Sequence, residues 1–205
     1  MRLWSLIYTY RMNQFVSKVW GALYSIWVSQ FIGEVGEETH FEAPLLLQGG
    51  GQRRIRIGSH TSFGHHCVLG CWEKYVTVDG VDHYEPEIII GNHCSIGEYC
   101  HITAINKITI GDGLLTGRFV YIGDNSHGGL SLEEANIPPA QRHLISKGEI
   151  KIGRNVWVGD KVSIFGGVTI GDNVIIGAGS VVTHDIPSNC MAAGMPTKVL
   201  KELKS

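Results

Sequence analysis

The chain of 205 residues lacks several features that would place it in a common class of protein. It has no excess of positive charge, because 17 Lys and Arg stand against 19 Asp and Glu, and a net charge of −2 provides no field for binding nucleic acid. Its longest run without a charged residue, 19–33, has 15 residues and is too short for a membrane-spanning helix. The apolar stretch 3–10 is short and no small-residue cleavage site follows it, so we expect no signal peptide.

Glycine and aliphatic residues are abundant instead, and they follow a period of six. The chain has 27 glycines and 43% hydrophobic residues, which suits one domain with a substantial core. Positions five and one of successive hexads share one face of a strand, while Gly, Asp and Asn gather at positions two to four, where a tight turn needs them. The pattern predicts a parallel β-solenoid. Six unbroken hexads over 152–187 read IGRNVW, VGDKVS, IFGGVT, IGDNVI, IGAGSV and VTHDIP.

An aliphatic residue followed by Gly and a polar turn marks the start of each coil. Against a coil of three hexads, or 18 residues, the successive spacings of 22, 33, 20, 42 and 18 predict about six coils and two insertions, at about 70–89 and 128–150. Both insertions follow the third hexad of their coil, so we expect them to leave from one corner with bases about 10 Å apart. Long loops of this kind usually carry function. The marker residues are Val35, Ile57, Ile90, Ile110, Ile152 and Ile170.

The segments that flank the solenoid, 33–187, have a different pattern. Residues 1–32 are predicted to form a helical segment with an apolar stripe, and Gly21 is a candidate break. We expect this helix to cover the open end of the solenoid, with contact to a membrane interface near a lipid-linked substrate as the alternative. Residues 188–205 are expected to cap the other end, with a short closing helix over 196–204. The stripe comprises Trp4, Tyr8, Phe15, Val19, Leu23 and Ile26.

Three of the five cysteines, Cys67, Cys94 and Cys100, occupy the inward fifth position of their hexads. We expect them to be core residues in a reducing compartment, which favours a cytoplasmic location. Cys71 and Cys190 fall outside the pattern and receive no role.

One histidine is placed unlike the others. In the hexad 122–127, which reads IGDNSH, Ser126 takes the inward position and His127 the outward one, where the larger insertion begins. A histidine held by a rigid strand and overhung by a loop is well placed as a general base. From register alone, an ordinary surface histidine is the alternative.

The residues from Asp124 onward resemble a known family. The segments DNSHG (124–128), SKGEIKIG (146–153), NVWVG (155–159), GGVTIGDN (166–173), GAGSVVT (177–183) and AGMP (193–196) are similar to hexapeptide O-acetyltransferases. That family includes galactoside, maltose, and capsule or exopolysaccharide acetyltransferases. The resemblance is dense over 124–200 and looser over 32–123. It implies an all-β, left-handed parallel β-helix, although ordinary parallel crossovers are right-handed. It also implies acetyl-CoA as donor, no metal, and a homotrimer with active sites between subunits.

The resemblance assigns a mechanism to His127. The imidazole would take a proton from an acceptor hydroxyl as that oxygen attacks the thioester, and would return the proton to the CoA sulfur without an acyl-enzyme. Backbone amides at a coil corner would stabilise the oxyanion. Asn125 matches an acceptor-contacting residue, with turn formation as the alternative. Asp124 or Glu134 could orient the imidazole, although a solvated turn is the stronger expectation.

The expected donor site follows from the repeat and the resemblance together. Asp160 and Ala178 are 18 residues apart and should stack on adjacent coils, where corner amides could bind the pantetheine arm. Asp160 departs from the Ser of related enzymes, so oxyanion stabilisation there should come from backbone N–H. Lys198 could meet CoA phosphates, with a solvated lysine as the alternative. The expected cofactor-binding residues are Trp157, Gly159, Asp160, Ala178, Thr183 and Lys198.

Two surfaces complete the picture of the solenoid. Trp157 and Ile175 should form an outward apolar row below Leu115, which predicts a subunit interface at Ile175 and an interface or cofactor wall at Trp157. The insertion 70–89 contains Trp72, Tyr75, His83 and Tyr84, and the shared corner should place it beside His127. Aromatic rings stack on sugar faces, so Trp72 and Tyr84 are expected to bind the acceptor.

Four alternatives remain open from the sequence. Within the acyltransferases, the reaction could be N-acylation of an amino sugar nucleotide, or acetylation of serine or a xenobiotic. The spacing of His60 and His65 allows a zinc enzyme of the γ-carbonic anhydrase type. However, His60 and His93 share one corner position and should form a surface ladder, while His65 and His66 lie on another corner. A non-catalytic solenoid is the fourth alternative.

Overall fold

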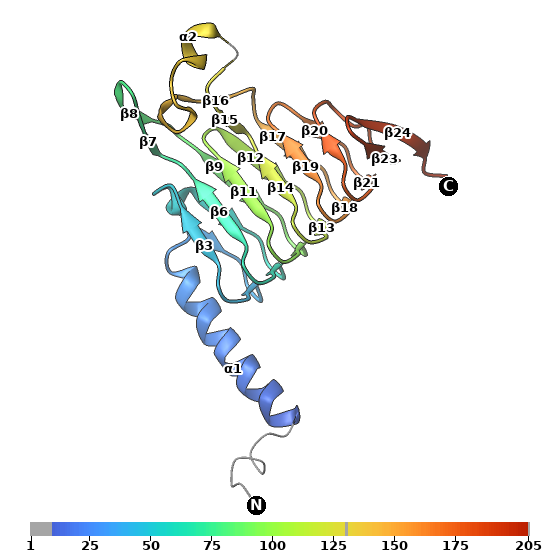
Figure 1. Ribbon diagram of the computed structural model, residues 1–205. Coiled ribbons are helices and arrows are strands. Elements are labelled where there is room, and N and C mark those ends of the chain that lie inside the picture. Colours follow the sequence, from blue (N-terminus) through green and yellow to red (C-terminus); the bar gives the residue numbers. More distant parts are fainter. Residues whose placement is uncertain (1–9, 130, 205) are drawn as a thin grey trace, which may run out of the picture.

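The computed structural model describes residues 10–129 and 131–204, which form a parallel β-helix preceded by a helix (Figure 1). Each coil contributes one short strand to each of three sheets. The first sheet contains β1 (Glu34–Val35), β4 (Ile55–Ile57), β9 (Glu87–Ile90), β12 (Lys107–Ile110), β17 (Ile150–Ile152) and β20 (Thr169–Ile170). The second contains β2 (His40–Phe41), β5 (Ser62–Phe63), β10 (Ser95–Ile96), β13 (Leu115–Thr116), β18 (Trp157–Val158), β21 (Ile175–Ile176), β23 (Cys190–Gly194) and β24 (Thr197–Glu202). The third contains β3 (Leu46–Gln48), β6 (Val68–Cys71), β11 (His101–Ala104), β14 (Tyr121–Gly123), β19 (Ser163–Phe165) and β22 (Val181–Val182).

The register predicted from the coil markers is confirmed. Val35 pairs with Ile57, and the following markers pair in turn at Ile57–Ile90, Ile90–Ile110, Ile110–Ile152 and Ile152–Ile170. The five isoleucines are at most 3% exposed, so they stack as one column of the core. Burial of this column stabilises each coil through its neighbours, because a single coil cannot bury its own apolar edge.

The cysteines are part of the same core. Cys67, Cys94 and Cys100 are buried, as predicted, and all are free thiols. Cys71 and Cys190, which received no role from the sequence, are buried free thiols as well. Cys71 is the last residue of β6 and Cys190 is the first residue of β23, and both side chains pack in the interior.

Corners of the helix use backbone in the left-handed region. His60 (φ 56°) and His93 (φ 55°) occupy one such corner on successive coils. Their rings stack with centroids 4.8 Å apart and planes 2° from parallel, so the predicted surface ladder is confirmed. Within residues 10–129 and 131–204, no three His, Cys, Asp or Glu side chains group as metal ligands.

Both insertions leave from the corner at which the third sheet ends. The first forms the antiparallel hairpin β7 (Lys74–Thr77) and β8 (Gly80–His83). The second begins with β15 (Asn125–His127), continues through α2 (Leu132–Ala135) and the 3-10 helix η3 (Pro139–Gln141), and returns along β16 (Leu144–Ser146), which pairs antiparallel with β15. Figure 1 shows the two insertions side by side above the coils, and the amide of Val78 donates to the carbonyl of Gln141 at 2.7 Å.

The helix α1 (Tyr10–Ser29) continues through Gly21 without the expected break. Its last turns pack on the first coil through Val28, which is 2% exposed, and the adjoining 3-10 helix η2 (Gln52–Arg54) precedes β4. Ser25 Oγ accepts a hydrogen bond of 2.9 Å from the amide of Phe41, and the Tyr24 hydroxyl accepts one of 2.7 Å from the amide of Leu45. The end of α1 therefore caps amides of the first coil.

The predicted stripe of α1 does not make this contact. Val19, Leu23 and Ile26 are exposed, because the solenoid contacts the neighbouring face of the helix that carries Ser25 and Val28. Trp4 and Tyr8 lie outside the described residues. Among the described helices, none is long and apolar enough to cross a membrane.

The expected closing helix over 196–204 is wrong. After β23, the chain turns through Gly194 and Pro196 into β24, which pairs antiparallel with β23. Because β23 continues the second sheet beside β21, its outer edge would carry unpaired backbone groups. The strand β24 satisfies that edge directly, which a helix would not do.

Candidate active site

His127 lies at the base of the second insertion, on β15. The residue is exposed, and its backbone is paired across the hairpin with that of Leu144. It borders a cavity of about 470 Å³, together with Asn125, Phe165 and Thr183. The expected inward position of Ser126 is wrong, because the chain leaves the coil after Gly123 and Ser126 is exposed on the hairpin.

Tyr75 from the other insertion meets the imidazole. Its hydroxyl donates to the carbonyl of Ala140 at 2.9 Å and lies 3.3 Å from Nδ1 of His127. A tyrosine hydroxyl has one hydrogen, so with that hydrogen on Ala140 its oxygen can only accept from Nδ1–H. This arrangement keeps the proton of a neutral His127 on Nδ1 and leaves Nε2 unprotonated, as a general base requires.

Asp124 anchors the strand that carries His127, and the expected solvated turn is wrong. The carboxylate is 1% exposed and accepts hydrogen bonds from the amides of Ile105 at 2.9 Å and Asn106 at 3.0 Å. Burial raises the pKa of Asp124, while these two amides act in the opposite direction. The carboxylate therefore ties the start of β15 to the preceding coil. Glu134, the other candidate orienter, instead accepts from the amide of Gly129 at 2.8 Å.

Asn125 and Trp72 meet on one residue of the third sheet. The Trp72 indole N–H donates to Thr103 Oγ1 at 3.2 Å, and the Asn125 amide nitrogen donates to the Thr103 carbonyl at 3.3 Å. The Trp72 ring also lies 6.0 Å from the Tyr75 ring, edge to face. Trp72 is thereby connected to His127 through one intervening aromatic ring, since Tyr75 and His127 are 5.5 Å apart.

Tyr84 has a different position from the one expected for an acceptor ligand. Its hydroxyl donates to Asp82 at 3.0 Å and accepts from the amide of Leu144 at 3.1 Å, so it joins the two insertions. Burial is the main cause that raises the pKa of Tyr84 to about 12, and the hydrogen bond to Asp82 is the second cause. The hydroxyl stays neutral at physiological pH and can donate.

An ion pair reinforces the same junction. His143 Nδ1 lies 2.6 Å from Asp82 Oδ2, and its Nε2 lies 3.1 Å from Asp79. Hydrogen bonds to Asp82 and Asp79 raise the pKa of His143, and the hydrogen bond from His143 lowers the pKa of Asp82. Since His143 precedes Leu144 of β16, the junction fixes the strand that pairs with β15.

The expected donor residues lie mainly at a different corner, between the second and third sheets. Asp160 and Ala178 stack as predicted, with the amide of Gly179 donating to the Asp160 carbonyl at 2.8 Å. A side chain at Gly159 would come within 2.6 Å of the Ala178 amide nitrogen, so the backbone is closely stacked there. The Asp160 carboxylate accepts from the amide of Arg118 at 2.9 Å, which satisfies it within the corner.

The remaining expected donor residues are divided among three places. Trp157 is half exposed in the outward row between Leu115 and Ile175, where the sequence placed it. Lys198 is exposed on β24, not on a helix. Only Thr183 shares the cavity of His127, and it lies 18 residues after Phe165 on the next coil.

Sequence reasoning placed Tyr75 beside His127 only as one of the aromatic residues of the first insertion, and it assigned no role to Phe165 or Lys147. Phe165 and Lys147 border the cavity. The pairing of Gly123 with Phe165 was readable from the coil register, so Phe165 could have been found by counting. The contact of Tyr75 depends on the fold of an insertion that follows no period.

Comparison with known proteins agrees with this architecture. Residues 149–184 match the family described as bacterial transferase hexapeptide (six repeats). The candidate lipopolysaccharide biosynthesis O-acetyl transferase WbbJ of Escherichia coli is 40% identical over 106 residues, which cover 50% of this chain and 54% of that protein. Galactoside O-acetyltransferase of E. coli is 44% identical over 101 residues, covering 47% and 44%. The chain thus spans about half the length of these curated relatives.

Solved structures extend the likeness to most of the chain. A maltose O-acetyltransferase from Clostridium difficile 630 superposes with a TM-score of 0.57 at 29% identity, over 87% of this chain and 73% of that one. AntD, an N-acyltransferase from Bacillus cereus in complex with dTDP and 3-hydroxybutyryl-CoA, has a TM-score of 0.68 at 20% identity, over 87% of each chain. A Vibrio cholerae hexapeptide-repeat acetyltransferase complexed with acetyl-CoA has a TM-score of 0.58 at 24% identity, over 90% and 78%. The last two show the fold alone. The predicted left-handed β-helix and the resemblance to hexapeptide-repeat transferases are confirmed.

Proposed function

We propose that this hexapeptide-repeat chain is an acyl-CoA-dependent O-acyltransferase that moves acetyl from acetyl-CoA to a hydroxyl of a sugar or polysaccharide precursor. The observation that carries the proposal is the setting of His127. The imidazole is exposed in a cavity at the base of the second insertion, and its Nδ1 lies 3.3 Å from the Tyr75 hydroxyl of the first insertion, which leaves Nε2 free to act as the base. That is the arrangement a general base needs.

In the proposed reaction, Nε2 of His127 accepts the proton of the acceptor hydroxyl as its oxygen attacks the thioester carbonyl. The tetrahedral intermediate collapses with cleavage of the carbon–sulfur bond, and the imidazolium returns the proton to the leaving sulfur. The Nδ1–H of the imidazolium points at the Tyr75 oxygen, so the positive charge that forms on His127 is accompanied by a hydrogen-bond acceptor.

Donor binding is proposed at the corner of Asp160 and Ala178, in a homotrimer whose active sites lie between subunits. Backbone from successive coils stacks closely at Gly159 and Ala178, and peptide groups exposed at this corner could bind the amide groups of a pantetheine arm. This corner and His127 lie at opposite ends of the strands of the third sheet, so one chain does not join them. Packing of two subunits would bring the corner of one to the histidine of the next. The exposed row of Leu115, Trp157 and Ile175 offers apolar surface for that contact.

The acceptor is proposed to lie between Asn125 and the aromatic pair Trp72 and Tyr75. Aromatic rings stack on sugar faces, and the Trp72 ring is held in place by its bond to Thr103. Tyr84 shapes this region through the junction of the insertions, not by direct contact. N-acylation of an amino sugar nucleotide is the second candidate, since AntD, an N-acyltransferase, has the same fold. The buried free thiols suit a reducing, cytoplasmic location.

Turnover of acetyl-CoA by the full chain against a panel of sugars, glycans and amino sugar nucleotides tests the proposal. We expect CoA release with at least one sugar hydroxyl acceptor and transfer of acetyl to oxygen, located by mass spectrometry. Transfer to nitrogen only would select the second candidate. If no acceptor of either class leads to CoA release, and calorimetry detects no binding of acetyl-CoA, the non-catalytic solenoid is the remaining alternative.

Replacement of Tyr75 by phenylalanine tests the positioning of the base. The variant keeps the ring and loses the acceptor for Nδ1–H, so we expect kcat to fall about tenfold with little change in the Michaelis constant for acetyl-CoA. Tyr99→Phe, in an exposed stack with Phe119, is the matched control. An unchanged kcat in Tyr75→Phe would remove Tyr75 from the mechanism.

A further inference from the structure

We propose that α1 is an interfacial anchor, which lies on the surface of an anionic lipid bilayer through one apolar face. This inference goes beyond the proposed reaction and does not depend on it. At about 100° per residue, six exposed residues of α1 fall within a sector of about 120°. Their side chains are between 42% and 66% exposed, so the rest of the described chain leaves this face uncovered. The face comprises Val16, Val19, Trp20, Leu23, Ile26 and Trp27, and is called the α1 stripe below.

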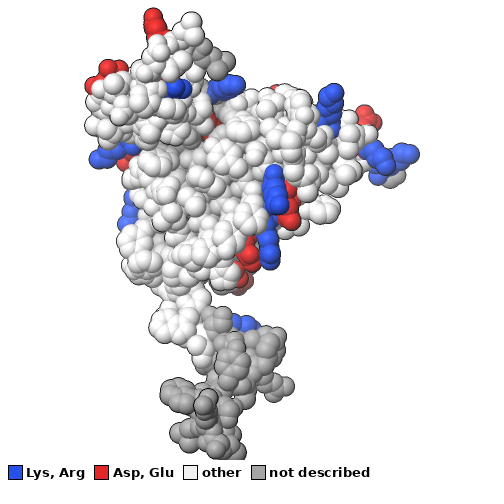
Figure 2. Space-filling view, in the orientation of Figure 1, with Lys and Arg blue, Asp and Glu red and all other residues white. Residues whose placement is uncertain are grey.

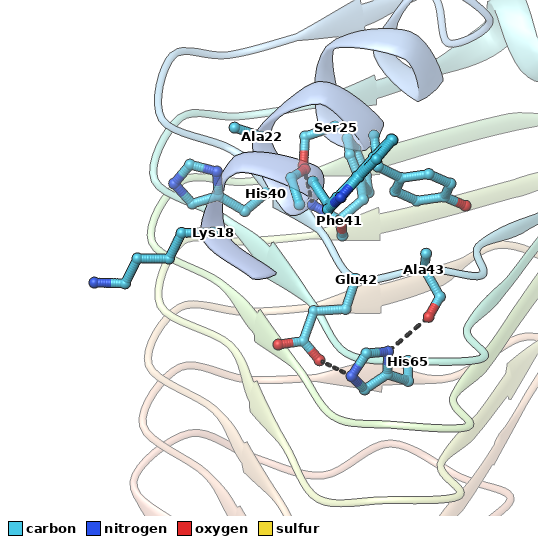
Figure 3. A pocket seen from close by; sticks show the side chains of 11 residues that line it. Lys18, Ala22, Ser25, His40, Phe41, Glu42, Ala43 and His65 are labelled. Carbon is cyan, nitrogen blue, oxygen red and sulfur yellow. Dashed lines mark hydrogen bonds and ion pairs between the residues drawn. The ribbon is translucent and has the colours of Figure 1, made fainter. Parts of the chain in front are cut away.

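The opposite side of α1 is committed to the solenoid. Ser25 and Val28 contact the first coil, and where the helix rises away from that coil it leaves a groove of about 730 Å³ above β2 (Figure 3). Lys18 extends from the groove toward solvent, while His65 and Glu42 pair at its far rim at 3.2 Å. With the solenoid on one side of α1, a planar surface can meet the α1 stripe from the other side. Figure 1 shows that the helix projects beyond the coils, which leaves room for such a surface.

The charge of the segment that carries α1 favours an anionic surface over a neutral one. Residues 1–33 contain Arg2, Arg11 and Lys18 and no Asp or Glu. Where α1 leaves the solenoid, the face shown in Figure 2 is mostly uncharged. A segment with positive charge alone is attracted by anionic lipid headgroups, which contribute up to a Debye length from the surface.

The composition of the stripe favours a bilayer over a second copy of the helix. Soluble coiled coils flank their apolar seam with residues of opposite charge that pair between helices, and α1 offers no acid for such pairs. Trp20 and Trp27 sit one above the other on the stripe, and tryptophan is enriched where membrane meets water. Since α1 cannot cross a membrane, it would lie in the interface with its stripe among the headgroups and upper acyl chains.

Flotation of the full chain with vesicles tests this inference. We expect binding to vesicles of equimolar phosphatidylcholine and phosphatidylglycerol, and weaker binding to phosphatidylcholine alone. The double variant Leu23→Glu, Ile26→Glu removes apolar area and adds two negative charges, so its partition should fall at least about tenfold. Both residues are exposed, so the melting temperature should not change.

Leu203→Glu is the control for the substitution itself, because it places a glutamate at an exposed leucine, as at Leu23, but at the other end of the molecule. It should bind vesicles as the parent chain does, and all three proteins should turn over acetyl-CoA equally with a soluble acceptor. The inference is overturned if the parent chain does not float with anionic vesicles, or if the double variant floats equally well. It is also overturned if the double variant loses a lipid-free oligomer in sedimentation velocity, because a second copy would then cover the stripe.

Discussion

Replacement of His127 by alanine is expected to lower the turnover of acetyl-CoA by roughly 100-fold to 10,000-fold. The variant removes the group that accepts the hydroxyl proton, and an unassisted hydroxyl is a weak nucleophile at neutral pH. Affinity for acetyl-CoA should change little, because the proposed donor corner lies at Asp160 and Ala178. The measurement is steady-state kinetics at saturating acetyl-CoA, combined with calorimetric binding of the donor.

The control for His127→Ala is His93→Ala, an exposed histidine stacked on His60 at the corner between the first and second sheets. Both histidines are exposed, so neither variant should lose much stability, and a difference in turnover well below the melting temperature reports the chemistry. A His127→Ala chain that retains near-normal turnover would exclude the proposed mechanism while leaving the fold and the donor site intact.

Replacement of Asp124 by alanine is expected to give the largest loss of stability among the residues around His127. The buried amide of Ile105 loses its acceptor, and a buried unsatisfied donor costs about 1–3 kcal/mol in the free energy of unfolding. In a chain of this size, such a loss lowers the melting temperature by about 2–12 °C. Turnover should also fall at temperatures where the variant is folded, because β15 loses its tie to the preceding coil. Thermal unfolding and kinetics well below the transition separate the two effects.

Asp112→Ala is the matched control for Asp124→Ala. Asp112 also accepts a hydrogen bond from a corner amide on the neighbouring coil, that of Asn92 at 2.7 Å, but it is exposed. Water can replace the lost carboxylate at Asn92, so the melting temperature should fall much less. Equal losses in the two variants would show that burial of Asp124 does not strengthen its role.

The coils could be predicted from the sequence because their physics is local and repeated. Each inward isoleucine needs a partner on the next coil, and each corner needs a tight turn, so six residues are enough to set the register. The same register placed Cys94 in the core and stacked Asp160 on Ala178. It also indicated that His127 lies where regular pairing ends.

The contacts that depend on the insertions could not be predicted in this way. Tyr75 reaches His127 because two insertions from different coils fold against each other, and neither has a period. The polar neighbours of Asp124 suggested a turn at the surface, yet its carboxylate is buried against the preceding coil of the β-helix. The carboxy-terminal hairpin replaced an expected helix because an unpaired strand edge outweighs local helix preference.

The order of the strands in the third sheet sets the distance between His127 and the coil that contacts α1. From β3 on the first coil to β14, which leads into His127, the sheet passes through β6 and β11. Three steps of about 4.8 Å place the base of β15 about 14 Å from the coil on which α1 is mounted. Because stacked coils are rigid, the solenoid acts as a spacer of fixed length. With α1 on a bilayer, the imidazole would be separated from the lipid surface by this distance. It could then reach a sugar that extends outward from the membrane, but not the lipid headgroups.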